Sequence, residues 1–589
     1  MARRRGAEAD LLAETIRPER LGFLVVAVVL TAMLAIRLAL PLMLARFVDL
    51  AIERADASSL VSLASLYVVL ALVAQALLMV VTWRSVHLSW RAGNRLRKRL
   101  ADHSAHLDMA WHSRHSPGLL IERIDGDVTA MVTFFTNVLV QVVGNAVLTV
   151  AMLVVAFSID LRAGLVLTLT TVSGAYLLFR LRLAAVPARE AEREVNARLY
   201  GDLEERLGGL EDLRANGAGE YAVGRLMSHS AMSWRAARRA SLLGDGAYAA
   251  AAITFGVGSA ATLVVGFALE RNGLVTVGQV VALYRYSELM RMPLELIAEQ
   301  LKEFQKAFAG ARRANQILNT RSALDDGPLG HDAVGEGAAE VRFDGVTFAY
   351  ESSEDPVLRD LDLVIPAGTH LGVVGRSGSG KTTLGRLLLR LWETTRGSVS
   401  IAGIDVRRFE RSALRRHVAV VTQDVDVLRA SVRDNLTLLG SRPADDATLE
   451  SILNRVGLDR WLAALPDGLD TKLDGPSGLS AGEAQLLAFA RAFLTDPSVV
   501  LLDEASSRLD PETERHIAQA TAELLAGRTA IVIAHRLDTL EHMDHIAVLS
   551  EGRLVEWGQR QALADDPTST YSRLRQMAAG GIDVDEALT

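Results

Sequence analysis

Long apolar segments dominate the first half of the chain. An α-helix needs about 20 apolar residues to cross a bilayer. Six segments reach or approach that length: Leu21–Leu44, Leu60–Thr82, Phe134–Phe157, Leu165–Phe179, Ala247–Leu269 and Leu274–Ile297. The fourth is short and needs its flanks, while Arg285, Glu288 and Arg291 interrupt the sixth. Buried helices of a soluble domain are the alternative, but this chain lacks the residues to cover them. The pattern therefore predicts an all-α membrane domain of six helices.

The second half shows a different pattern, in which short apolar runs end in polar residues. Val499–Leu502 is continuously apolar and is followed by two acidic residues, and Ile531–Ala534 is followed by a histidine. Leu371–Val374 precedes a glycine-rich loop and a helical repeat of leucines. Continuous apolar runs are typical of buried parallel strands. The chain is thus expected to be a multidomain membrane protein whose helical domain is followed by an α/β domain.

Arginine is unevenly distributed among the connections between the predicted spans. The segments after the second and fourth spans are long, helix-patterned and rich in arginine. The short connections after the first, third and fifth carry little positive charge, with Arg54, Arg162 and Arg271 among their few arginines. Positively charged loops stay in the cytoplasm. We therefore expect a multi-pass protein of the cytoplasmic (inner) membrane, with both termini and the α/β domain in the cytoplasm and with helices that extend below the bilayer.

The glycine-rich loop has the pattern G-x-x-x-x-G-K-T, typical of a phosphate-binding loop. Its glycines allow backbone N–H groups to surround phosphates, the lysine reaches the β/γ oxygens, and the threonine hydroxyl binds Mg²⁺. The strand before it and the helix after it are the required context, since a helix N-terminus favours anions. A glycine-rich surface loop is the alternative. The loop residues are Gly375, Arg376, Ser377, Gly378, Ser379, Gly380, Lys381 and Thr382.

The acidic pair after Val499–Leu502 is the candidate catalytic element. Asp503 is expected to hold Mg²⁺, as aspartates at this position of phosphate-binding-loop ATPases do. Glu504 is expected to polarise the attacking water, and the alternative is a solvated loop carboxylate. The carboxyl end of a parallel strand favours the first interpretation, because ligands bind there in α/β sheets.

A third motif, Leu479-Ser480-Ala481-Gly482-Glu483, resembles the Leu-Ser-Gly-Gly-Gln signature of ATP-binding cassette (ABC) transporters. Taken alone, Ser480 and Glu483 form a helix capping box. The order of phosphate-binding loop, glutamine, signature, acidic strand and histidine makes the resemblance specific, and nearly the whole chain resembles a half-transporter of the ABC exporter type.

This resemblance implies ATP and Mg²⁺ as cofactors and gives roles to further residues. Tyr350 is expected to stack on adenine, Gln423 to contact Mg²⁺, and His535 to contact the γ-phosphate. The implied ATP-binding set is Tyr350, Gly375, Arg376, Ser377, Gly378, Ser379, Gly380, Lys381, Thr382, Thr383 and Gln423, with Mg²⁺ at Thr382, Gln423 and Asp503. The signature residues Ser480, Ala481, Gly482 and Glu483 would contact ATP held by a partner subunit.

The resemblance also implies a domain order and an activity. The expected parts are a cytoplasmic N-terminal elbow (1–20), a transmembrane domain (21–320), a linker (321–338), an ATP-binding domain (339–578) and an acidic tail (579–589). Segments 116–125 and 203–210 resemble the two coupling segments of the exporter family. The expected activity is ATP hydrolysis coupled to export by alternating access, and an importer or an ATP-gated channel or sensor of the same fold is the alternative.

Departures from the family pattern bear on the partner. Ala481 replaces a glycine, Glu483 replaces a glutamine, the segment 471–478 lacks the family's Gly-Glu pair, and Arg508 stands where alanine is usual. Lys381, Glu504 and His535 are intact. This combination favours one half of a heterodimer, whose altered signature faces the partner's impaired ATP site. A homodimer with a harmless signature variant is the alternative.

The substrate is the least constrained prediction. Arg37, Arg285 and Glu288 are ionisable residues at membrane depth, which by default face a cavity. Their mixed charges leave a lipid, a peptide, a siderophore or a drug open. The net charge of −7 argues against nucleic acid as a partner, and the chain has no cysteine, which excludes disulfides and thiolate metal sites.

Overall fold

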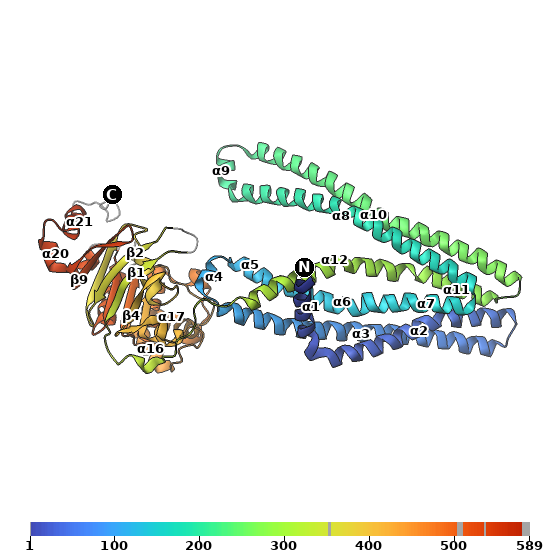
Figure 1. The fold of residues 1–589 in the computed structure, drawn as a ribbon, viewed down its shortest axis with the longest axis horizontal. Coiled ribbons are helices and arrows are strands. Elements are labelled where there is room, and N and C mark those ends of the chain that lie inside the picture. Colours follow the sequence, from blue (N-terminus) through green and yellow to red (C-terminus); the bar gives the residue numbers. More distant parts are fainter. Residues whose placement is uncertain (1, 351–354, 504–510, 535–537, 580–589) are drawn as a thin grey trace. The chain divides into compact units, whose positions relative to one another are not determined.

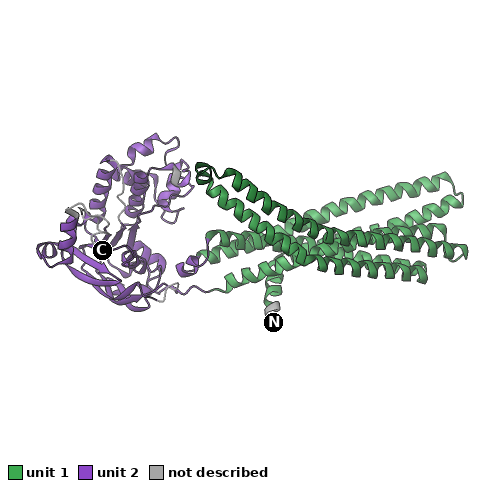
Figure 2. Ribbon diagram, turned by 90° about the horizontal axis from the view of Figure 1, so that it is seen from above, with its two compact units in different colours: residues 1–105, 117–320 green, residues 106–116, 321–589 purple. Residues whose placement is uncertain are grey.

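The computed structural model describes residues 2–350, 355–503, 511–534 and 538–579. These residues form two compact units (Figure 2). The first contains residues 1–105 and 117–320, and the second contains residues 106–116 and 321–589.

The first unit is helical throughout. Its long elements run side by side, and α8 and α10 form an extended hairpin that is closed by α9 (Figure 1). The elements are α1 (Ala2–Ile16), the 3₁₀ helix η1 (Arg17–Glu19), α2 (Arg20–Ile52), α3 (Ala57–Ala105), α5 (Pro117–Ile121), the π-helical η2 (Glu122–Gly126), α6 (Asp127–Asn137), the π-helical η3 (Val138–Gly144), α7 (Asn145–Ile159), α8 (Leu161–Gly208), α9 (Leu210–Ala215), α10 (Gly219–Arg271), α11 (Val277–Leu289) and α12 (Arg291–Asn319).

Five helical segments in the described residues are long and apolar enough to cross a membrane: Ala7–Ile52, Ala57–Ala105, Pro117–Ile159, Leu161–Gly208 and Gly219–Arg271. The predicted fourth span lies inside α8, whose 48 residues supply the missing length. The predicted sixth span falls on α11 and α12. α11 has only 13 residues and is too short for this criterion, and α12 is long enough but too polar. Together the helices agree with about six spans and confirm the predicted helical membrane domain.

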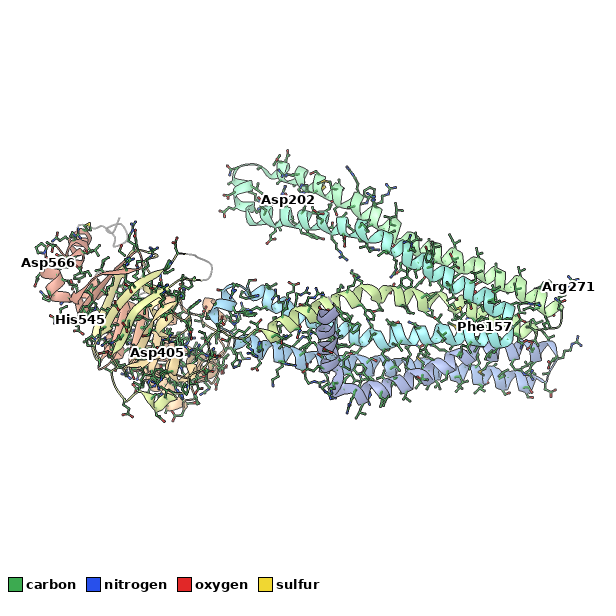
Figure 3. All side chains as sticks on the ribbon, viewed as in Figure 1. Phe157, Asp202, Arg271, Asp405, His545 and Asp566 are labelled. Atoms are coloured by element: carbon green, nitrogen blue, oxygen red, sulfur yellow. The ribbon has the colours of Figure 1, made fainter. Side chains whose placement is uncertain are left out.

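The helices extend much farther than a bilayer requires. Asp202 lies at the α9 end of the α8–α10 hairpin, while Phe157 and Arg271 lie at the opposite end of the unit (Figure 3). α10 has 53 residues, about 80 Å of helix at 1.5 Å per residue. Since the hydrocarbon core is only about 30 Å thick, each such helix has a long polar extension.

The second unit is an α/β structure with two sheets. The larger sheet has the strand order β10-β9-β3-β8-β7-β6, and the smaller has the order β2-β1-β4-β5. The strands are β1 (Val341–Phe348), β2 (Leu358–Ile365), β3 (His370–Gly375), β4 (Arg396–Ile401), β5 (Ile404–Asp405), β6 (Val418–Val421), β7 (Val499–Asp503), β8 (Thr529–Ile533), β9 (His545–Ser550) and β10 (Arg553–Gln559). Strands β3, β6, β7, β8 and β9 are parallel, and β10 is antiparallel to β9.

Helices pack on the sheets of this unit. Because its central strands are covered on both faces, they consist almost entirely of apolar residues. Their bounds are α4 (Met109–Ser113), α13 (Lys381–Leu388), α14 (Arg411–His417), α15 (Val432–Thr437), α16 (Asp446–Arg455), α17 (Asp459–Ala464), α18 (Ala481–Phe493), α19 (Pro511–Leu525), α20 (Arg560–Asp565) and α21 (Thr570–Ala579), with short 3₁₀ turns between them. The four apolar residues of β7 and all five residues of β8 are buried. The two faces of the central sheet therefore lie in separate apolar cores.

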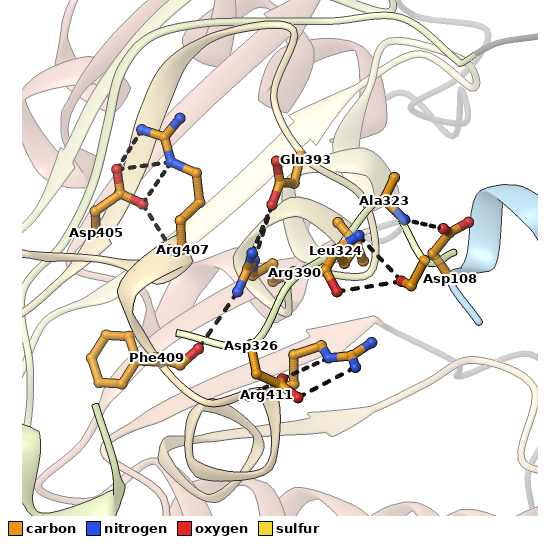
Figure 4. Close-up of polar contacts among 11 residues, drawn as sticks. Asp108, Ala323, Leu324, Asp326, Arg390, Glu393, Asp405, Arg407, Phe409 and Arg411 are labelled. Atoms are coloured by element: carbon orange, nitrogen blue, oxygen red, sulfur yellow. Dashed lines mark hydrogen bonds and ion pairs between the residues drawn. The ribbon is translucent and has the colours of Figure 1, made fainter. Parts of the chain in front are cut away.

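The start of the predicted linker is hydrogen-bonded within the second unit. Gly327 N donates to Phe409 O at 3.0 Å. The Asp326 carboxylate pairs with the Arg411 guanidinium at 2.8 Å (Figure 4). Asp108, before α4, accepts from Ala323 N at 2.8 Å and from Trp111 N at 2.7 Å. Burial raises the pKa of Asp108, but these backbone N–H groups prevail and hold it below its ordinary value.

Candidate nucleotide site

The phosphate-binding loop connects β3 to α13, and either the surrounding space or the backbone conformation favours each of its glycines. A Cβ at Gly375 would lie 2.2 Å from Leu549 O, and a Cβ at Gly380 would lie 2.6 Å from a methyl of Leu358. Gly378 has φ +83° and Gly380 has φ +104°, values that side chains disfavour. Gly380 is the N-cap of α13 and makes no side-chain cap bond. The loop therefore presents backbone N–H groups at an open helix N-terminus.

Two polar side chains within the loop fit a polyphosphate. Lys381 is 6% exposed, and its Nζ donates to the carbonyl oxygens of Gly375 and, at 3.1 Å, Arg376. The Ser379 hydroxyl is buried and has no hydrogen-bond partner among the described residues. A buried ammonium bonded to loop carbonyls and an unpartnered hydroxyl are donors suited to phosphate oxygens. Thr382 is exposed, as a Mg²⁺-binding hydroxyl would need to be.

Tyr350 lies at the side of this loop in an aromatic cluster. Its hydroxyl is 3.2 Å from the Thr383 hydroxyl and accepts from the Arg386 guanidinium at 2.9 Å. Its ring packs edge-on against Trp392, with 5.5 Å between centroids, and Arg386 lies 5.3 Å from the centroid of the Trp392 ring. The two α13 residues thus fix the tyrosine beside the phosphate-binding loop. Sequence reasoning missed Arg386 and Trp392, whose pairing with Tyr350 arises only from tertiary packing.

Sheet register brings other predicted residues to the same edge. Asp503 ends β7 and is paired with Ile533 of β8, which lies between β7 and β3. Gln423 follows β6, whose Val421 pairs with Leu502, and it is exposed. Because the carboxyl ends of parallel strands meet at one sheet edge, Asp503, Gln423 and the phosphate-binding loop share that edge. Glu504, Arg508 and His535 lie outside the described residues.

The signature segment forms the N-terminus of α18, and the capping box predicted from the sequence is present. The Ser480 hydroxyl accepts from Glu483 N at 3.2 Å, and one Glu483 carboxylate oxygen accepts from Ser480 N and from the Ser480 hydroxyl, both at 2.8 Å. Gly482 is buried, while Ser480 and Ala481 are exposed. The surface predicted to meet a partner's phosphate therefore already carries a carboxylate of its own chain.

The predicted substrate-cavity residues lie on two helices that pack together. Arg285 and Glu288 of α11 pair with each other at 2.5 Å, and Tyr284 also donates to Glu288 at 3.0 Å. Arg37 of α2 is half-buried. The buried Tyr286 joins α11 to α2 by donating to Leu38 O at 2.6 Å. The opposite charges on α11 thus compensate each other locally.

Comparison with known proteins places both units in one family. The model described as the ABC transporter transmembrane region matches residues 22–294, and the one described as ABC transporter matches residues 358–507. An "ATP-dependent lipid A-core flippase" of Dechloromonas aromatica is 31% identical over 504 residues, which cover 83% of this chain and 84% of that protein. A "Multidrug efflux ATP-binding/permease protein" of Mycobacterium bovis is 33% identical over 500 residues, covering 84% of this chain and 42% of that protein. The chain thus spans less than half of the length of that relative.

A solved structure has the same fold. The structure of a bacterial Atm1-family ABC exporter with ATP bound superposes with a TM-score of 0.77 and 22% identity, covering 96% of this chain and 99% of the other. These matches confirm the predicted order, in which a helical membrane domain precedes an α/β ATP-binding domain. The chain belongs to the ABC transporter family, with its transmembrane and ATP-binding regions in a single polypeptide.

Proposed function

We propose that this chain is one half of a dimeric exporter that couples ATP hydrolysis to the movement of an amphipathic substrate across the cytoplasmic membrane. The observation that carries the proposal is the phosphate-binding loop of a chain with a long helical membrane domain. The loop presents a buried lysine and a serine hydroxyl that has no partner in the part of the chain that the structure describes. The arginine-rich connections support cytoplasmic termini and a cytoplasmic ATP-binding unit.

In this proposal, ATP with Mg²⁺ supplies the phosphoryl-transfer free energy. The loop backbone, Ser379 and Lys381 bind phosphate oxygens, and Lys381 exchanges its bonds to Gly375 O and Arg376 O for them. The metal would be held by Thr382, Gln423 and Asp503. Tyr350 would lie at the base of the nucleotide, and Thr383 would lie at its phosphates. Glu504 would orient and deprotonate water, and His535 would contact the γ-phosphate.

The dimer proposal rests on the signature helix. An anion that approaches the N-terminus of α18 meets the Glu483 carboxylate, which is bonded to Ser480 N. Like charges repel, and the donor that an anion would use is already occupied. This supports a heterodimer in which the altered signature completes the partner's less active ATP site, with the homodimer as the alternative.

Names of the relatives support the substrate class. Besides the lipid A-core flippase and the multidrug efflux protein, a "Fatty acid ABC transporter ATP-binding/permease protein" of Mycobacterium bovis is 31% identical over 474 residues. Two of these names, those of the flippase and of the fatty acid transporter, refer to amphipathic molecules. A cavity containing Arg37 and the Arg285–Glu288 pair would suit such a molecule, because one polar region lies among otherwise apolar helices.

Inside-out membrane vesicles provide the test. The chain is expressed with any co-purifying partner, and ATP-dependent accumulation of a labelled long-chain fatty acid and of a lipophilic dye is measured. We expect accumulation of at least one probe by the parent and none by Glu504→Gln or Lys381→Ala. Accumulation that continues at the parent rate in Lys381→Ala would contradict the proposal.

A further inference from the structure

An arginine-lined cleft lies at the start of the first unit, away from the predicted substrate cavity. It has a volume of about 640 Å³ and lies between the α1–η1–α2 segment on one side and α3 on the other. Its lining includes Arg17, Arg20, Arg95 and Arg99, with Ala92 and Leu96 buried at its base.

The cleft has an excess of positive charge. Arg95 pairs with Glu19 at 2.8 Å, and Arg99 pairs with Glu14 at 2.9 Å. Arg17 and Arg20 are exposed, and their side chains make no hydrogen bond or ion pair with the residues that the structure describes. Two guanidinium groups are therefore available for an anion, and guanidinium binds phosphate oxygens in a bidentate fashion.

The walls of the cleft are fixed by contacts on the other side of α1. Glu8 is 5% exposed and pairs with Arg312 of α12 at 2.6 Å, while Leu11 and Leu12 of α1 are buried. The position of α1 against α3 and α12 is thus set by packing and by an ion pair outside the cleft. Arg17 and Arg20 follow α1 directly, so the available charges are held by a packed element.

The position of the cleft beside an exposed apolar surface of α2 suits a lipid headgroup. Leu21 lines it and is 72% exposed, and α2 continues with the exposed residues Leu24, Val25 and Val28, which form an apolar outer surface. On α3, Trp83 and Trp90 are exposed, and Gly22 of α2 lies against Leu88 between them. Exposed tryptophans mark the boundary between hydrocarbon and water. The arginines thus lie just beyond the start of the apolar surface.

We propose that this cleft binds the phosphate of an anionic phospholipid. In the membrane orientation proposed above, the lipid comes from the cytoplasmic leaflet. Arg17 and Arg20 contact the phosphate, and the acyl chains lie along the apolar surface that begins at Leu21. A phospholipid suits the cleft better than a soluble phosphate, because the cleft borders that surface. The site requires the chain to span a membrane but does not require it to transport anything.

Native mass spectrometry of the full chain in detergent tests this proposal, with any co-purifying partner retained. Phosphatidylglycerol and phosphatidylcholine with the same acyl chains are titrated separately. Each arginine near a membrane surface contributes about 1 kcal/mol to binding an anionic lipid. We therefore expect Arg17→Gln with Arg20→Gln to weaken phosphatidylglycerol binding roughly 10- to 30-fold and to leave phosphatidylcholine binding unchanged.

Two further variants distinguish binding of the lipid at a defined site from general electrostatic attraction between the lipid and the protein surface. Arg84→Gln with Arg91→Gln removes the same charge from exposed positions of α3 that do not line the cleft, and we expect phosphatidylglycerol binding to be retained. Arg17→Lys with Arg20→Lys keeps the charge but loses the planar fork, so an intermediate loss is expected. ATP hydrolysis in lipid-free detergent is expected to be the same in all variants and the parent.

Several results would overturn the lipid site. Equal losses in the two glutamine pairs would mean that the attraction is general, and no loss in either would remove Arg17 and Arg20 from any site. Equal affinity for the two lipids would exclude phosphate-charge recognition, because phosphatidylcholine has no net charge. If inorganic phosphate binds as tightly as phosphatidylglycerol, the cleft is a site for free phosphate. A parent without ATPase activity would contradict the proposed function and leave this titration unaffected.

Discussion

The phosphate-binding loop and the signature segment both lead into a helix N-terminus. The two termini differ in whether side chains of the same chain bond to their backbone N–H groups. At α13, Gly380 occupies the N-cap, and the buried Ser379 hydroxyl has no hydrogen-bond partner within the described ranges. At α18, Ser480 and Glu483 bond to each other's backbone N–H groups. The first terminus has donors for an external anion, whereas the second uses two of its donors, Ser480 N and Glu483 N, within the chain.

This difference shows that a helix N-terminus is only a potential anion site. Its backbone N–H groups attract negative charge in every helix. A neighbouring carboxylate occupies one of these donors, as Glu483 does at Ser480 N, and its charge opposes the approach of an anion. This difference supports the proposal that the chain holds ATP at its own loop and completes the ATP site of a partner less well.

The largest expected effect is on hydrolysis at the chain's own site. Glu504→Gln should leave ATP binding intact and reduce turnover roughly 10²- to 10⁴-fold, because a general base is lost while the phosphate contacts remain. Steady-state hydrolysis and equilibrium ATP titration of the same preparation check this. Turnover within a few-fold of the parent would remove Glu504 from the role of base.

Removal of the loop lysine should weaken ATP binding itself. A hydrogen bond to a charged group contributes about 1.5–3 kcal/mol, so Lys381→Ala is expected to lower ATP affinity roughly 10- to 100-fold. Fluorescent-nucleotide titration gives the affinity, and Lys472→Ala, an exposed lysine of the same unit, is the control. Unchanged affinity in Lys381→Ala would show that this side chain does not bind phosphate.

A matched pair of serine variants compares the two termini directly. Ser480→Ala removes a helix cap and should lower the free energy of unfolding by about 1 kcal/mol without changing ATP affinity. Ser379→Ala removes a hydroxyl without a partner among the residues that the structure describes, so stability should change little, while ATP affinity should fall by up to about tenfold. Denaturation of the nucleotide-free protein and ATP titration of both variants check this. A loss of ATP affinity in Ser480→Ala together with a loss of stability in Ser379→Ala would contradict the proposed difference between the termini.

Hydropathy predicted the membrane helices well, because bilayer thickness sets a minimum apolar length. Hydropathy underestimated the length of the fourth helix, because α8 continues beyond the apolar segment into polar and charged residues. Such residues lower the mean hydropathy, so the method ends the predicted span before the helix ends. The capping box was predictable because Ser480 and Glu483 interact over three residues. The contacts of Tyr350 with Arg386 and Trp392, and of Asp108 with Ala323, were not predictable, because they join distant segments.

The most direct test of the difference between the termini is a variant in which the signature residues of the family are restored. Ala481→Gly with Glu483→Gln removes the methyl and the charge, and glutamine still completes the capping box, so α18 should remain folded. The chain is purified with and without co-purifying partners, its mass in detergent is determined by light scattering, and ATP turnover is compared between parent and variant. We predict a complex with a second, different chain and little change in turnover. A stable, active homodimer whose turnover rises clearly on restoration would contradict the heterodimer proposal.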